Sequence, residues 1–170
     1  MTDVLTLRPA RESDIPAIWR VHTRAVGETC RQRYDGAVID AWVERLKPES
    51  YGAVLRRATV LVAEAGGQVV AFAQVDFGEA EVQAVYVLPE MEGRGLGSLL
   101  LSAVERAAAD RGLTHLTLKA TLNAEAFYVR HGWHPVRHDI HKITEQISLM
   151  AVAMEKTIAP RPEPATPLRD

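Results

Sequence analysis

The sequence predicts an α+β fold with a mixed, mostly antiparallel central sheet of about seven strands, flanked by about four helices. Strand-like and helix-like patterns follow one another in the order strand, helices, three strands, helix, strand, helix and two strands. Short turns join the three consecutive strands, which favours an antiparallel meander. A chain of 170 residues with 47% hydrophobic content is long enough to bury one proper core.

The sequence of the amino-terminal part predicts one strand and two helices. Residues 4–8 form a short strand, and Ser13-Asp14 then caps a helix whose apolar residues recur at helical spacing. A second helix is predicted over residues 37–46, where it stops before a proline. Trp19 and Trp42 lie at helical spacing from other apolar residues, which favours the core for both.

The rest of the sheet comes from the middle and the end of the chain. Residues 59–64 and 69–77 flank Ala65-Gly66-Gly67-Gln68, which is typical of a hairpin turn, and residues 79–88 follow as a third strand. The last strands are predicted over residues 113–120, 133–138 and 147–155.

A glycine-rich turn, Pro89-Glu90-Met91-Glu92-Gly93-Arg94-Gly95-Leu96-Gly97, joins the third of these strands to an amphipathic helix. The first turn of a helix has unpaired N–H groups and the positive end of the helix dipole, so glycines there let a phosphate approach closely. The segment predicts a pyrophosphate site. A tight turn that needs glycine for positive φ is the alternative.

Two other phosphate-binding motifs fit this segment less well. A dinucleotide-binding fingerprint expects its glycines after an early strand, an acidic residue about 20 positions later and a continuing parallel sheet. Here the turn follows strands that look antiparallel, and no Lys-Ser/Thr pair ends it as in a P-loop. A nucleotide-binding module is therefore disfavoured.

The run Glu92-Gly93-Arg94-Gly95-Leu96-Gly97 resembles the signature of the GNAT superfamily of acyl-CoA N-acyltransferases, Gln/Arg-x-x-Gly-x-Gly/Ala. Its first position departs from that pattern, with Glu92 where Gln or Arg is usual. In the family this backbone binds the pyrophosphate of coenzyme A, and Arg94 would add a charge-assisted contact. The resemblance implies acetyl-CoA as acyl donor. The cofactor-binding residues that it implies are Tyr86, Val87, Leu88, Glu92, Gly93, Arg94, Gly95, Leu96, Gly97, Ser98 and Asn123.

Residues 123–133 are similar to the family's other landmark, an Asn followed by a short helix with Phe-Tyr and a Gly-aromatic end. Locally they predict a helix capped by Asn123 and ended by Gly132 in the left-handed conformation, which needs no function. In the family the Asn contacts the pantetheine arm. The Tyr, here Tyr128, lies near the departing sulfur and commonly serves as general acid.

The resemblance implies an N-acetyltransferase that moves an acetyl group directly from acetyl-CoA to a primary amine of a small molecule or protein. The reaction would use a ternary complex without a covalent enzyme intermediate, with an oxyanion donor from the backbone around residues 86–88. Tyr128 and Glu81 are its catalytic candidates. A non-catalytic acyl-CoA sensor on the same scaffold is the alternative function.

The sequence does not determine which residue deprotonates the amine. Glu81 is the first choice and Glu79 the second, because a carboxylate near the cleft suits that task. A solvated, charged strand edge explains both residues equally well. The family commonly has a β-bulge here, which would break the simple alternation of side chains.

Composition excludes some classes of partner and predicts the location of the protein in the cell. The formal net charge of −2 argues against a nucleic-acid surface. No segment approaches the ~20 apolar residues that span a bilayer, so we expect a cytoplasmic protein without a membrane partner. Cys30 is the one cysteine of the chain, so an internal disulfide is excluded. Four histidines cluster late in the chain, and surface or rim positions, which include the acceptor side of the site, are favoured for them over a metal site: His131, His134, His138 and His141.

Acceptor specificity is expected in two loops, residues 27–35 between the first two helices and residues 139–146 between the last strands. In the first loop, Arg24, Arg31, Arg33 and Tyr34 would suit an acidic amine, or they form an ordinary solvated loop. The sequence does not name the acceptor.

The domain boundary is predicted near the carboxyl end. Residues 1–158 are expected to form the acyltransferase domain, and residues 159–170, which carry four prolines, an extended tail. Dimers are common in the family, so the resemblance allows a homodimer.

Overall fold

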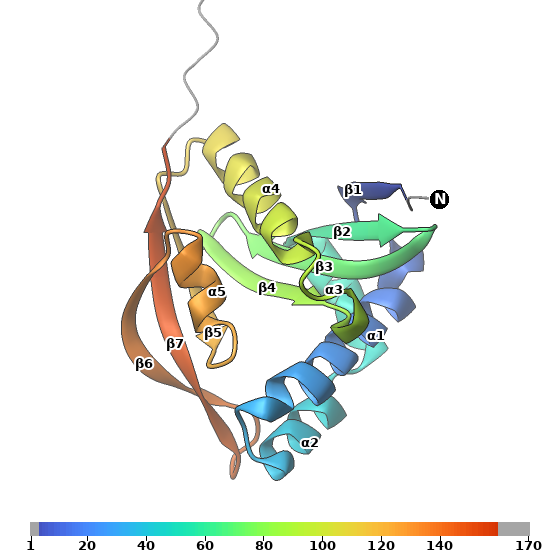
Figure 1. Cartoon of the computed structure of the whole chain (residues 1–170), viewed down its shortest axis with the longest axis vertical. Helices are drawn as coiled ribbons and strands as arrows, with labels where there is room; N and C mark the ends of the chain where they lie inside the picture. Colours follow the sequence, from blue (N-terminus) through green and yellow to red (C-terminus); the bar gives the residue numbers. More distant parts are fainter. Residues whose placement is uncertain (1–3, 160–170) are drawn as a thin grey trace, which may run out of the picture.

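A seven-stranded sheet runs through the part of the chain that the structure, a computed structural model, describes: residues 4–159 (Figure 1). Its strand order is β1-β2-β3-β4-β5-β7-β6, and only β4 and β5 pair in parallel. The predicted mixed, mostly antiparallel sheet is confirmed. All but the first residue of the expected tail lies outside the described residues. The strands are β1 (Leu5–Pro9), β2 (Thr59–Ala65), β3 (Gln68–Asp76), β4 (Glu81–Val87), β5 (His115–Thr121), β6 (His134–Lys142) and β7 (Ser148–Thr157).

The flanking α-helices within residues 4–159 are α1 (Ile15–Arg24), α2 (Gly36–Arg45), α3 (Tyr51–Arg57), α4 (Leu96–Asp110) and α5 (Glu125–Arg130). Four of them were predicted, and α3 is the additional one. It is a single short helix with Gly52 in its first turn, so its own sequence is a weak helix signal. Buried Tyr51 anchors it, and its hydroxyl lies 2.8 Å from Nδ1 of His22 on α1.

The one parallel contact in the sheet is very short. β4 pairs with β5 only through Glu81↔Thr117 and Val82↔Leu118, and beyond these pairs the two strands diverge (Figure 1). On its other side β4 stays paired with β3, with a register shift at Gln74/Val75 that leaves Gln83 as an extra residue. The expected β-bulge is therefore present.

Helices cover both faces of the β2–β4 part of the sheet (Figure 1). α4 packs on β2, β3 and β4, whereas α1 packs on β3 and β4 from behind in this view. On the α1 side, the His22 ring lies against Tyr86, with ring centroids 4.3 Å apart, and against Phe72. Burial lowers the pKa of His22 to about 3, so this ring is neutral near pH 7 and packs as part of the core.

The amino-terminal strand is tied to α1 by a charged contact. Asp14 begins α1 as expected, but its side chain makes no capping bond to that helix. Its carboxylate instead accepts from the Arg11 N–H and from the Arg8 guanidinium at 2.7 Å, and Arg8 also pairs with Glu64 on β2. The hydrogen bond from Arg8 holds the pKa of Asp14 below its usual value.

A separate apolar cluster joins α2 to the β6–β7 hairpin. Ile143, Leu149 and Ala151 are buried there against Val38 and Trp42, which confirms Trp42 as a packing residue. Tyr34, from the loop before α2, packs on the same cluster. Its hydroxyl donates to Met150 O at 2.6 Å and accepts from Leu122 N–H at 2.9 Å. Tyr34 thus ties the segment before α2 to the β5–β7 part of the sheet.

Glu105 on α4 connects the carboxyl-terminal elements. Its carboxylate accepts from the indole N–H of Trp133 at 2.9 Å and from Nζ of Lys156 at 2.7 Å. Trp133 is 1% exposed, so its N–H has no access to water. A buried polar group of this kind needs a partner.

Glu105→Ala should therefore destabilise the fold, because it leaves the Trp133 N–H and the Lys156 ammonium without their acceptor. We expect a loss of about 1–3 kcal/mol in the free energy of unfolding, measured by urea denaturation. Glu155→Ala is the matched control, since Glu155 pairs with His115 at the surface and its loss should stay within about 0.5 kcal/mol. Equal effects of the two substitutions would contradict this role.

Candidate active site

A cavity of about 420 Å³ opens where β4 and β5 diverge. Its walls come from β4, the glycine-rich turn, the end of β5, α5 and the turn that follows α1. The predicted site residues that line it are Tyr86, Val87, Glu92, Gly93, Gly95, Leu96, Gly97, Ser98, Asn123 and Tyr128. The two segments singled out in the sequence therefore face one space.

The glycine-rich turn has the geometry of an anion site. Gly93 and Gly95 have φ of +73° and +79°, and a Cβ on either would meet no atom within 4 Å, so the turn faces open space. Gly95 is the N-cap of α4, and the first bond of that helix runs from Leu99 N–H to Gly95 O. The N–H groups of the preceding helical residues, Leu96 and Ser98 among them, have no acceptor within the helix and are available to an anion.

One backbone donor of β4 points into the cavity. Leu88 N–H donates to Val70 O at 2.9 Å, which fixes the pattern of bonds between β3 and β4. Because such bonds alternate in an antiparallel pair, Val87 opposite Ala71 turns its N–H away from β3. No β5 residue pairs with β4 at this level. Of residues 86–88, Val87 thus offers its N–H to the gap, whereas Tyr86 contributes its side chain.

Asn123 does not cap α5, and this part of the sequence prediction is wrong. The N-cap is Ala124, whose carbonyl accepts from Tyr128 N–H at 3.2 Å. The Asn123 side chain lines the cavity instead, and its Oδ1 is buried without a hydrogen-bond partner. An unpaired buried amide oxygen is costly, so Asn123 Oδ1 is an open acceptor for an N–H group. The amide groups of a pantetheine arm fit that requirement.

Tyr128 places a phenol at the centre of the site. It is 7% exposed, packs edge-on against Phe127 and Trp133, and lines both the main cavity and a small one beside it. Burial raises the pKa of Tyr128 well above its usual value. The hydroxyl therefore holds its proton at neutral pH. Gly132, with φ +81°, ends α5 in the left-handed conformation as predicted.

His131 is the one of the four late histidines that lines the main cavity. Its Nε2 lies 2.8 Å from Ser98 Oγ, and its Nδ1 lies 2.7 Å from Phe127 O. A carbonyl oxygen only accepts, so Nδ1 carries the hydrogen, and in the neutral ring Nε2 accepts from the Ser98 hydroxyl. This bond links α5 to the first turn of α4.

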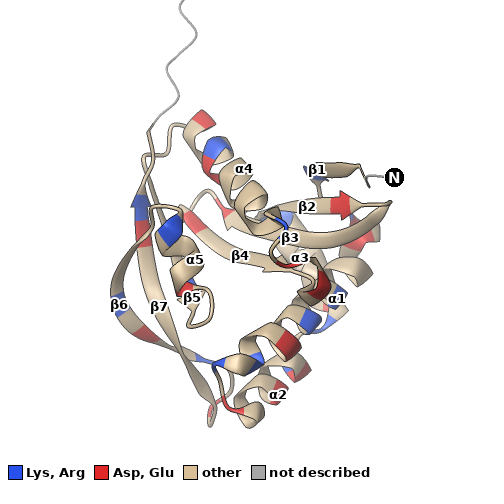
Figure 2. Cartoon of the chain, in the orientation of Figure 1, with Lys and Arg blue, Asp and Glu red and all other residues tan. Residues whose placement is uncertain are grey.

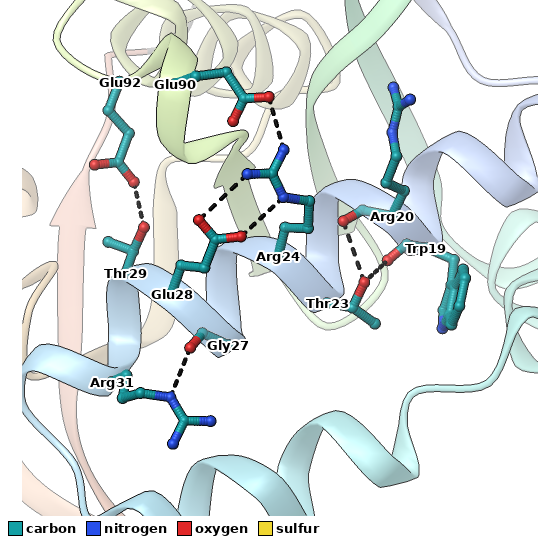
Figure 3. A network of polar contacts seen from close by, with 10 residues as sticks. All are labelled: Trp19, Arg20, Thr23, Arg24, Gly27, Glu28, Thr29, Arg31, Glu90 and Glu92. Carbon is teal, nitrogen blue, oxygen red and sulfur yellow. Dashed lines mark hydrogen bonds and ion pairs between the residues drawn. The ribbon is translucent and has the colours of Figure 1, made fainter.

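Glu92, the residue that departs from the family signature, is held by a hydroxyl. Thr29 Oγ1 donates to Glu92 Oε1 at 2.6 Å (Figure 3). Beside this pair, Arg24 bridges Glu28 at 2.9 Å and Glu90 at 2.7 Å. These contacts connect the glycine-rich turn to the π-helical turn Ala25–Thr29 that extends α1. The sequence analysis expected this loop to contact the acceptor, but it did not single out Thr29 or its neighbour Cys30, and both line the cavity.

Other expected residues lie outside the cavity lining. Leu88 is buried with its N–H paired to β3, and Arg94 is exposed. Glu81 is half-buried at the paired end of β4 and β5 and lines neither cavity. Its role as base stays a prediction.

The arginines proposed for acceptor recognition mostly have internal partners. Arg24 pairs with Glu28 and Glu90, and Arg31 pairs with Asp40 at 2.6 Å and donates to Gly27 O (Figure 3). Among residues 4–159, no three His, Cys, Asp or Glu side chains are grouped to hold a metal ion. None of the helices in that range is long and apolar enough to cross a membrane.

Solved structures share this fold. A GCN5-related N-acetyltransferase from Rhodopseudomonas palustris, also described as a class-II aminotransferase, is 24% identical, with a TM-score of 0.86 over 93% of this chain and 98% of that one. The PaiA N-acetyltransferase of Thermoplasma acidophilum, solved in complex with coenzyme A, is 19% identical, with a TM-score of 0.76 over 91% of this chain and 99% of that one.

Sequence comparison finds a relative that matches part of the chain and a protein family that matches most of it. The uncharacterized N-acetyltransferase YjcF of Bacillus subtilis (strain 168) is 34% identical over 56 residues, which are 33% of this chain and 40% of that protein. The model of the acetyltransferase (GNAT) domain matches residues 30–158, most of the chain. The chain therefore belongs to the GNAT acetyltransferase family, whose domain uses acetyl-CoA as its acyl donor.

Proposed function

We propose that this protein transfers an acetyl group from acetyl-CoA directly to a primary amine of a small molecule or protein. Transfer takes place in a ternary complex without a covalent enzyme intermediate. The observation that carries the proposal is the shared cavity between β4 and β5. There the amide-rich turn before α4, the unpaired Asn123 Oδ1 and the Tyr128 phenol face one space.

Each of these groups has a distinct task in binding. The free N–H groups after Gly95 hold the pyrophosphate, and the hydrogen bond from the Ser98 hydroxyl to His131 Nε2 fixes the first turn of α4 there. Asn123 Oδ1 accepts from an amide N–H of the pantetheine arm, which ends its unpaired state. The thioester end then lies between β4 and α5.

The chemistry that the donor supplies is a thioester whose C–S bond breaks as the amine nitrogen forms the new C–N bond. Val87 N–H points into this gap and donates a hydrogen bond to the carbonyl oxygen as negative charge develops on it. Tyr128 holds a proton beside the departing sulfur and releases it there. Burial raises the pKa of the Cys30 thiol to about 11, so Cys30 is a poor nucleophile, which supports direct transfer.

The amine approaches from the opposite side of the gap. A small cavity of about 30 Å³ is lined by Gln83 and Lys119, and it shares Tyr86, Thr121 and Tyr128 with the main cavity. A donor entering from the glycine-rich turn and an amine entering past Gln83 would meet at Tyr128. This arrangement supports attack within one ternary complex.

Gly95→Asp should weaken acetyl-CoA binding by tenfold or more, because a carboxylate would face the diphosphate at the helix N-terminus. Isothermal calorimetry measures this directly. Gly112→Asp is the matched control, since Gly112 at the other end of α4 also has positive φ, +77°, and open space around it. Unchanged binding by the Gly95 variant would contradict the pyrophosphate site.

Tyr128→Phe should lower kcat by about 100- to 10,000-fold while leaving acetyl-CoA affinity unchanged, because it removes only the proton donor. The assay follows release of free thiol from acetyl-CoA across a panel of amines. Tyr51→Phe, which removes a buried phenol that lines neither cavity, is the control. Tight acetyl-CoA binding by the unmodified protein with no turnover on any amine would favour the acyl-CoA sensor instead.

For the base we retain Glu81 as a proposal, acting through water because its side chain lies outside both cavities. Glu81→Gln should lower kcat by about 100-fold or more near neutral pH and leave acetyl-CoA binding intact. The same change at exposed Glu79, the second candidate, tests that residue in parallel. If both variants keep full activity and an unshifted pH profile, neither glutamate is the base.

A further inference from the structure

His131 connects the end of α5 to the turn where α4 begins. Its Nδ1 lies 2.7 Å from Phe127 O, and its Nε2 lies 2.8 Å from Ser98 Oγ. His131 and Ser98 both line the main cavity, and Ser98 is the third residue of α4. One hydroxyl group therefore separates the imidazole from the helix N-terminus to which the proposed function assigns the diphosphate.

The two hydrogen bonds of this imidazole respond differently to a proton. Nδ1 donates to the Phe127 carbonyl oxygen in either charge state, because that oxygen only accepts. In the neutral ring Nε2 accepts from the Ser98 hydroxyl, so the hydroxyl hydrogen is not available to a ligand. In the protonated ring Nε2 carries a hydrogen and donates it to Ser98 Oγ, which leaves the hydroxyl hydrogen free to turn elsewhere.

An anion at the first turn of α4 is the acceptor that this freed hydrogen would meet. Ser98 lines the cavity together with Gly95 and Gly97, so a diphosphate held by the free N–H groups of this turn lies beside its side chain. A hydrogen bond from a hydroxyl to an anionic oxygen is stronger than one between neutral groups. Protonation of His131 thus adds a donor and a positive charge to the anion site together.

The charged groups around His131 are balanced while the cavity is empty. Lys156 Nζ donates to His131 O at 2.7 Å, and Glu105 on α4 pairs with the same ammonium at 2.7 Å. Glu92 and Arg130 are the acidic and basic residues that line the cavity, and the lining residue from β5 is uncharged. Figure 2 shows basic residues on α5 and β7 and acidic ones on α4. A bound diphosphate adds negative charge to this balance and favours the protonated ring.

We propose that His131 is a positioning residue that takes up a proton when the diphosphate of acetyl-CoA binds, and that its hydrogen bond with Ser98 then reverses so that the Ser98 hydroxyl donates to a phosphate oxygen. One N–H bond forms at Nε2 with a proton from solvent, and the proton returns to solvent when the ligand leaves. This inference rests on the proposed function, because it needs the diphosphate at the turn before α4. Since the bound state holds the extra proton, the affinity for acetyl-CoA rises as the pH falls through the range in which imidazoles titrate.

Isothermal calorimetry of acetyl-CoA binding at pH 7, in buffers of different ionisation enthalpy, counts the protons taken up. The unmodified protein should take up more of a proton than His131→Gln, whose amide still hydrogen-bonds to Ser98 but does not ionise. The 3′-phosphate of the ligand also titrates near this pH, but it contributes equally to both measurements. His134→Gln is the matched control, since His134 is exposed and lines neither cavity, and it should keep the full uptake.

Ser98→Ala tests the reversal of the hydrogen bond itself. At pH 8 the neutral imidazole occupies the hydroxyl hydrogen, so the substitution should raise the Kd of acetyl-CoA by less than about twofold. At pH 6 the hydroxyl donates to the phosphate, and the same substitution should raise the Kd about tenfold or more. A hydroxyl that only supports the structure would give equal effects at the two pH values.

Equal proton uptake by the unmodified protein and His131→Gln would overturn this inference, and so would an effect of Ser98→Ala that does not change with pH. In either case acetyl-CoA still binds, so the proposed function stands. A failure of the unmodified protein to bind acetyl-CoA would instead overturn the proposed function and this inference together. Circular dichroism checks that each variant is folded, and none of these readouts depends on catalytic activity.

Discussion

The divergence of β4 from β5 is the constraint on which the rest of this structure depends. A sheet normally satisfies the backbone N–H and C=O groups of its inner strands through both neighbours. Here β4 keeps both neighbours only at Glu81 and Val82, and from there on it faces a cavity on one side. The backbone groups turned toward that cavity, Val87 N–H among them, are available to a bound molecule. The binding site is therefore part of the sheet itself.

Several contacts distant in the sequence keep the gap open at a fixed width. At the paired end the short parallel contact holds β4 to β5, and at the far end Tyr34 joins the loop before α2 to β7 and to Leu122. Across the mouth, Thr29 and Arg24 bind Glu92 and Glu90 of the glycine-rich turn. A carboxylate near the phosphate site is thereby engaged by a hydroxyl, which reduces its repulsion of an anionic ligand.

The sequence predicted what local chemistry determines. Glycines that need positive φ, a proline before a turn and apolar residues at strand or helix spacing gave the sheet, four of the helices and the turn that begins α4. The same local logic failed at Asn123, because a side chain that suits an N-cap was placed in the cavity and Ala124 began α5 instead. Helix α3 was missed because tertiary packing around Tyr51, not helix propensity, holds it.

The rest of the site depends on contacts between distant segments. Thr29 and Cys30 reach the cavity because α1 continues into a π-helical turn, and His131 reaches Ser98 because α5 packs beside α4. The spacing of residues along the chain does not predict either contact. For Glu81 the local prediction was correct, since it lies on β4, but β4 is still paired with β5 at that residue and no cavity opens there.

The most direct test of this account is a crystal structure of the protein with acetyl-CoA bound. We predict the diphosphate on the N–H groups after Gly95, an N–H of the pantetheine arm on Asn123 Oδ1, the thioester carbonyl facing Val87 N–H and the sulfur beside the Tyr128 hydroxyl. Electron density that places the diphosphate away from this turn, or the thioester away from Tyr128, would contradict it.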